Sequence, residues 1–163
     1  MNKKNQEEKT MHRHILLAMI FTSMFLASCN KWTTRSTNSN YANYGWHTTY
    51  STFCDQFILD ISCGQRQNRR IVAIDCRNTR QEESHRVFAE IYNNRVTNFS
   101  LFNLSGNSFG YTNETALRKI WQNSIIRTLP TKSWFKKLPQ DVQQNAKLAI
   151  SKAEEQYGSR SNY

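Results

Sequence analysis

The chain contains few of the residues that interrupt or cross-link a polypeptide. It has five glycines, two prolines and four cysteines among 163 residues. So few glycines and prolines exclude collagen-like and low-complexity material, and four cysteines are too few for a disulfide scaffold of this length. Apolar residues make up 38% and aromatic residues 12% of the chain. The chain can therefore bury a core, and its length suits one domain.

Motifs of catalysis are also lacking. The sequence has no G-x-S-x-G, H-E-x-x-H, P-loop or G-x-G-x-x-G motif, and no C-x-x-C pair to hold zinc. Asp75, Glu90 and Asp60 could form a nuclease-like carboxylate set, but strand alternation predicts that each is a solvated residue. His85 and Ser84 stand in a polar stretch typical of a surface. We therefore expect no enzyme activity, no cofactor and no metal.

The one long apolar run lies near the N-terminus. Residues 15–27 contain only Thr22 and Ser23 as polar residues. Thirteen residues are too few to span a bilayer, which takes about 20, but they fit the apolar segment of a signal peptide. Lysines and an arginine on the N-terminal side supply its positive flank, and a start at Met11 would give a more compact signal.

The four residues that end this run, Leu26-Ala27-Ser28-Cys29, resemble the lipobox of bacterial lipoproteins. The resemblance implies a diacylglyceryl group on the Cys29 thiol, cleavage before Cys29 and acylation of the new N-terminus. Two or more acyl chains give stable membrane anchoring. By the same resemblance Asn30, where an Asp is associated with inner-membrane retention, favours the outer membrane. An ordinary cleaved secretory signal is the competing interpretation.

The sequence predicts four segments: a signal peptide at 1–28, a lipidated tether at 29–52, one domain at 53–158 and a tail at 159–163. The tether is rich in Thr, Ser and Asn and has no hydrophobic period. We expect its aromatic residues, among them Trp32 and Tyr50, to pack on the domain or lie at the headgroup level rather than form a binding site.

Alternating apolar residues predict about four strands after the tether. Phe57, Leu59 and Ile61 share one face of the first strand, and Val72 and Ile74 share one face of the second. Two further strands, joined by an Asn93-Asn94 turn, would place Phe88 opposite Phe99.

Helical spacing follows the strands. Asn113 is a suitable N-cap for a helix that runs towards Pro130, and Pro139 opens a second helix with Val142 on its apolar stripe. The fold class is therefore α+β, with a small antiparallel sheet followed by two to three C-terminal helices on one face.

The cysteines permit one disulfide in the domain. If Cys54 continues the strand of Phe57, Cys54 and Cys76 lie near the open end of one hairpin and can approach within disulfide distance. Cys63 would lie at the other end as a buried thiol.

A basic balance points to anionic partners. The chain from Cys29 onward has 18 Lys and Arg against 10 Asp and Glu. Arg66, Arg69 and Arg70 are expected to cluster, exposed, at the tip of the first hairpin, where they could bind carboxylate or phosphate groups.

The sequence thus predicts a non-enzymatic envelope lipoprotein that is anchored by its N-terminal lipid and binds a protein partner or stabilises an assembly of an envelope machine. The alternatives are a module that binds a polyanion (lipid headgroup, lipopolysaccharide or cell-wall glycan) and a lipid-anchored hydrolase. Nucleic acid is disfavoured as a partner because the periplasm normally lacks it.

Overall fold

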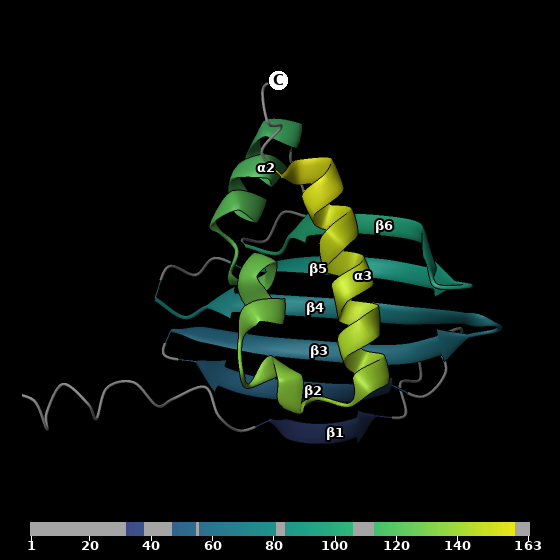
Figure 1. The fold of residues 1–163 in the computed structure, drawn as a ribbon. Coiled ribbons are helices and arrows are strands. Elements are labelled where there is room, and N and C mark those ends of the chain that lie inside the picture. Colours follow the sequence, from purple (N-terminus) through teal and green to yellow (C-terminus); the bar gives the residue numbers. More distant parts are fainter. Residues whose placement is uncertain (1–31, 38–46, 55, 81–83, 106–112, 159–163) are drawn as a thin grey trace, which may run out of the picture.

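The computed structural model describes residues 32–37, 47–54, 56–80, 84–105 and 113–158. Six antiparallel strands form one sheet in the order β1-β2-β3-β4-β5-β6, so each strand pairs with its neighbours in sequence. The helices cross one face of this sheet (Figure 1). An α+β fold with helices on one face is thereby confirmed, with six strands in place of the predicted four.

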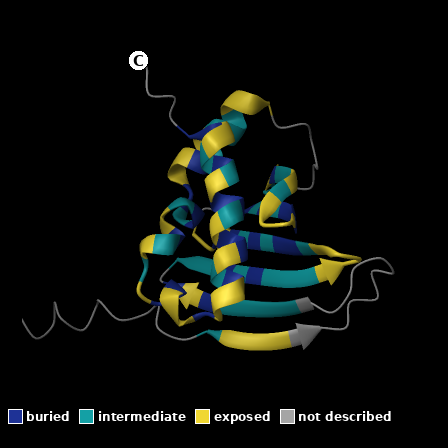
Figure 2. Cartoon of the chain, turned by 45° about the vertical axis from the view of Figure 1, so that its right-hand side comes forward, coloured by how far each residue is buried: buried dark blue, intermediate teal, exposed yellow. Residues whose placement is uncertain are grey.

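The strands are β1 (Thr33–Thr37), β2 (His47–Cys54), β3 (Phe57–Arg66), β4 (Arg69–Asn78), β5 (Ser84–Tyr92) and β6 (Arg95–Asn103). The helical part consists of α2 (Glu114–Asn123), the 3₁₀ helices η1 (Ile125–Thr131) and η2 (Phe135–Lys137), and α3 (Gln140–Tyr157). Exposure rises towards the β1 edge and the hairpin ends (Figure 2).

The core lies between the sheet and the helices. Leu59, Ile61, Val72 and Ile74 are all fully buried and Phe57 is half-buried, as the period of two predicts. Helix α3 contributes small side chains to the same core, including Ala146, Ala149 and Ala153. Small residues let this helix pack closely on the sheet.

The hairpin between β5 and β6 has the predicted turn. Asn93 and Asn94 both have positive φ, 48° and 58°, which a two-residue turn of this kind requires. A register shift at Glu90 and Ile91 then inserts one residue in β6. Phe88 consequently faces Ser100, and the predicted Phe88–Phe99 pair is wrong because a bulge moves the register by one residue.

The first helix is shorter than its apolar period suggests. The Asn113 side chain accepts a hydrogen bond from the Ala116 N–H and begins α2 as predicted, but the helix ends at Asn123. Ser124 is extended, and its side chain caps η1 by accepting from the Ile126 N–H. The chain therefore changes direction at Ser124, before Pro130.

The prediction of a tether at 29–52 is wrong for the part of this segment that the structure describes. β1 and β2 extend the sheet, and Thr52 is buried. Trp32 packs on Trp134 with ring centroids 5.4 Å apart, and its Nε1 donates to the Trp134 carbonyl at 2.8 Å. Half of the residues of β2 are Thr or Ser. The strand pairs through its backbone, but its sequence shows no apolar alternation that would predict it.

The predicted Cys54–Cys76 disulfide is absent, because the Cys76 thiol is free. Residues 55 and 56 lie between two strands, so Cys54 ends β2 rather than continuing β3. With β3 between them, β2 and β4 are about 9.5 Å apart, beyond the roughly 7 Å limit for bridging. Cys54 is itself disulfide-bonded.

The signal peptide and Cys29 also lie outside the described residues. Within the described part, no helix is long and apolar enough to cross a membrane.

Candidate functional site

The candidate site is the face of the sheet that no described element covers, here called the uncovered face. Because side chains alternate along a strand, the residues between those of the core point to this face. Its charged members are Arg35, Asp60, Arg66, Arg69, Asp75, Arg77, Arg86, Glu90 and Arg95. Six arginines against three carboxylates give this part of the surface an excess of positive charge.

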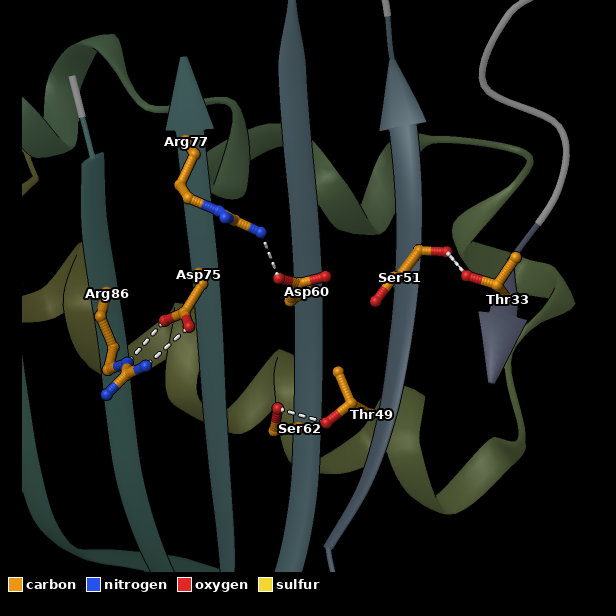
Figure 3. Close-up of polar contacts among 8 residues, drawn as sticks. All are labelled: Thr33, Thr49, Ser51, Asp60, Ser62, Asp75, Arg77 and Arg86. Atoms are coloured by element: carbon orange, nitrogen blue, oxygen red, sulfur yellow. Dashed lines mark hydrogen bonds and ion pairs between the residues drawn. The ribbon is translucent and has the colours of Figure 1, made fainter. Parts of the chain in front are cut away.

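Two carboxylates lie opposite each other at the centre of the uncovered face. Asp60 on β3 and Asp75 on β4 are cross-strand partners, an arrangement that like charges make unfavourable. Each is matched by an arginine: Arg77 Nη2 donates to Asp60 at 2.9 Å, and Arg86 donates to both Asp75 oxygens (Figure 3). The four side chains form a network of alternating charge.

A third ion pair lies nearer the hairpin tips. Glu90 is 7% exposed, and Arg69 Nη1 donates to its Oε2 at 3.1 Å. Half of the Arg69 side chain stays exposed. A carboxylate this buried needs such a partner, because an unpaired buried charge is strongly destabilising.

Apolar side chains frame the ion pairs. The exposed large hydrophobic residues of the described chain are Phe53, Tyr92 and Phe102, at 57%, 40% and 42% exposure. Their register places all three on the uncovered face. Exposed aromatic and arginine side chains together are typical of protein interfaces.

The predicted arginine triad is not one cluster. Arg66 and Arg69 are cross-strand partners at the hairpin end, but Arg70 is next to Arg69 and therefore points to the opposite, helix-facing side of the sheet. Arg69 is paired with Glu90, and Arg70 Nη2 donates to Asn94 Oδ1 at 2.6 Å. The proposal of a three-arginine contact surface at the tip is thus wrong, because strand alternation separates its members and an acid of the domain holds one of them.

His85 is buried rather than part of the polar surface expected for it. Its Nε2 lies 2.5 Å from Ser124 Oγ, and burial lowers the pKa of the imidazole to about 4, against a smaller opposing effect of Asp75. Ser124 Oγ already accepts from the Ile126 N–H, so its own proton can be donated to the neutral His85. The pair joins β5 to the start of η1.

The thiols and carboxylates offer little for catalysis. Burial raises the pKa of both the Cys63 and the Cys76 thiol to about 12, so both are neutral and weakly nucleophilic at physiological pH. Among the described residues, no group of three or more His, Cys, Asp or Glu side chains could hold a metal ion. The candidate carboxylates Asp60, Asp75 and Glu90 share a face, but each is held by an arginine.

Comparison with known proteins gives no match to a protein family, to a curated protein or to a solved structure. Alternation places Asp60, Asp75 and Glu90 on the uncovered face as predicted, but Glu90, which was expected to be solvated, is buried beside Arg69. The ion pairs between these strands could not be predicted from the sequence, because they depend on the registers of β3 with β4 and of β4 with β5, which alternation alone does not give.

Proposed function

We propose that this chain is a lipid-anchored protein of the bacterial cell envelope that binds an acidic partner protein through the uncovered face, without catalysing a reaction. The anchoring part rests on Leu26-Ala27-Ser28-Cys29, which resembles a lipobox, and on the apolar run before it. The outer membrane is the proposed location.

The observation that carries the binding part is the position of the exposed aromatic residues. Phe53, Tyr92 and Phe102 occupy three different strands and point to the same face. Burying aromatic and arginine side chains supplies much of the energy of protein interfaces.

The charge of this face favours an acidic partner. Arg69 and Arg77 are half-exposed, and each guanidinium has five N–H groups. Arg69 and Arg77 therefore have the chemistry to bind carboxylates of a partner as well as Glu90 and Asp60. Such bonds between ionised groups are stronger than neutral ones.

Binding of a polyanion is the second candidate, and the excess of arginines supports it. Phosphorylated headgroups, lipopolysaccharide and cell-wall polymers would meet the same guanidinium groups. A charged polymer would bury the three aromatic side chains less well than a protein surface would, and a protein is therefore the first candidate.

Crosslinking in living bacteria tests the proposal. A photoreactive phenylalanine analogue replaces Phe102, or Phe53, and the matched control replaces Gln144, which is exposed on α3. We expect one protein adduct of discrete mass from the two face positions, weakened by Arg77→Ser, and no such adduct from position 144. Adducts to lipid or glycan alone would favour the polyanion, and the same protein adduct from position 144 would contradict the proposed face.

A further inference from the structure

The described part of the domain begins close to the residue proposed to carry the lipid. Trp32 is its first residue, and only residues 30 and 31 separate it from Cys29. A fully extended chain gains at most about 3.6 Å per residue, so the Cα atoms of Cys29 and Trp32 are no more than about 11 Å apart. Acyl chains on Cys29 would therefore hold this end of the domain at the membrane surface.

The contact between Trp32 and Trp134 fixes where the chain leaves the domain. The ring centroids are 5.4 Å apart, and Trp32 Nε1 donates to the Trp134 carbonyl at 2.8 Å. Strand β1 follows at once and pairs with β2 along its whole length. The chain exit thus lies beside η2, which starts at the next residue after Trp134. This is the β1 end of the molecule, opposite the C-terminus (Figure 1).

The same end of the domain is basic. Residues 115–140 contain six Lys and Arg and no Asp or Glu. Three of the six, Lys132, Lys136 and Lys137, lie within three residues of Trp134. Lys136 and Lys137 are exposed on η2, and no ion pair joins any of the three lysines to a carboxylate of the described residues. Unpaired positive charge therefore lies next to the chain exit.

A membrane that contains anionic phospholipid attracts lysines in this position. Each Lys or Arg close to such a surface strengthens binding about fivefold, the equivalent of about 1 kcal/mol. The attraction falls off over roughly 8–10 Å at moderate salt, so only charges held near the headgroups contribute. The short connection from Cys29 meets this condition for the lysines beside Trp134 better than for basic residues at the β6 end of the sheet.

We infer that the end of the domain formed by η2 and the start of β1, here called the basic end, docks on a leaflet that contains anionic phospholipid. The inference rests on the proposed lipid anchor and adds an orientation to it. Strands are spaced about 4.8 Å apart, so β6 lies about 24 Å from β1 across the sheet. With the basic end on the bilayer, the sheet stands upright and the uncovered face stays open to a partner.

Photocrosslinking in vesicles tests this orientation. The whole protein is purified from membranes in detergent and reconstituted into vesicles of phosphatidylcholine and radiolabelled phosphatidylglycerol. A photoreactive phenylalanine analogue replaces Ser133, which is exposed beside Trp134, so that all lysines are kept. The matched control replaces Gln122, which is exposed on α2 at the β6 end. We expect labelled lipid adducts from position 133 and few from position 122.

Paired charge variants separate docking from anchoring. Lys136→Gln together with Lys137→Gln should lower lipid labelling from position 133 at least about fivefold, and high salt should do the same. Arg95→Gln together with Lys119→Gln removes the same charge from exposed residues at the β6 end and should label like the wild type. All variants should float with the vesicles, since their acyl chains remain.

Flotation distinguishes the two ways in which the inference can fail. A protein that does not float with the vesicles has no lipid anchor, and the proposed anchoring and the docking are then both wrong. A protein that floats but labels equally from positions 133 and 122 overturns the docking alone. Labelling that is unchanged by Lys136→Gln with Lys137→Gln, or reduced as much by the β6-end control, would also overturn it.

Discussion

Arg86 and Asp75 are cross-strand partners on β5 and β4, and the guanidinium donates to both carboxylate oxygens, from Nε at 2.6 Å and from Nη2 at 2.7 Å. The same Asp75 faces Asp60 on its other side. This bidentate pair therefore offsets the repulsion between two carboxylates at the centre of the uncovered face.

The first prediction concerns this pair. Arg86→Met should lower the free energy of unfolding by about 1–2 kcal/mol at low salt, since it removes a charged bidentate contact on a partly exposed surface. Adding Asp75→Asn should recover part of the loss. Urea unfolding of both single variants and the double variant measures the coupling, which should shrink at high salt. A coupling near zero at low salt would mean that the pair is incidental.

The second prediction contrasts the two faces of the sheet. Leu59 is fully buried, so Leu59→Ala should lower the free energy of unfolding by about 2–5 kcal/mol. Phe53 lies on the uncovered face at 57% exposure. Phe53→Ala should therefore change the free energy of unfolding by less than about 0.5 kcal/mol. Equal effects of the two substitutions in urea unfolding would contradict the assignment of faces.

Most of the central sheet could be predicted from the sequence, because its inner residues alternate strictly. The period of two in Phe57, Leu59 and Ile61 identifies β3, and that of Val72 and Ile74 identifies β4. The caps at Asn113 and Pro139 likewise follow from residue type.

The edge strands could not be predicted in the same way. β1 has the sequence TTRST and β2 is mainly hydroxyl and aromatic residues, so no apolar alternation identifies either strand. Without β2 as a separate strand, Cys54 is assigned to β3, and this wrong assignment leads to the wrong disulfide with Cys76. The predicted arginine cluster was wrong for a similar reason. Alternation places Arg69 and Arg70 on opposite faces only once the strand is known to begin at Arg69.

The third prediction tests whether the N-terminal segment is part of the domain. Trp32 packs on Trp134 with the two rings tilted, and its Nε1 donates to the Trp134 carbonyl. Trp32→Ala should lower the free energy of unfolding by about 1–3 kcal/mol. Trp32→Phe keeps an aromatic ring at this position and should have a smaller effect. Urea unfolding distinguishes them. If Trp32→Ala leaves stability unchanged, the segment is a tether after all.

The fourth prediction is a pH dependence due to His85. In the unfolded chain the imidazole takes up a proton as the pH falls below its ordinary pKa of 6.5, but in the folded protein only near pH 4. The unfolded state therefore binds more protons between these values, and stability falls as the pH is lowered through this range.

The size of this effect should be about 3 kcal/mol between pH 7 and pH 4. Because carboxylates also titrate there, the measurement is the difference between the wild type and His85→Gln in urea unfolding at several pH values. The variant should lose less stability on acidification. Parallel curves for the two proteins would show that His85 is accessible to protons in the folded state.

The proposed lipid anchor at Cys29 would set the compartment, and with it the kinds of partner that the uncovered face can meet. A disulfide is the chemistry that competes with lipidation for the Cys29 thiol, and Cys54 is a cysteine that is disulfide-bonded. A thiol alkylated by a diacylglyceryl group cannot form a disulfide, so the two chemistries exclude each other.

Mass spectrometry of the N-terminal peptide of the protein isolated from bacterial membranes distinguishes them most directly. We predict that the mature chain begins at Cys29, with a diacylglyceryl thioether and an acylated amino group, and that Cys29→Ser leaves an unprocessed precursor without acyl label. A peptide with Cys29 joined to Cys54, and no lipid mass on either residue, would contradict it.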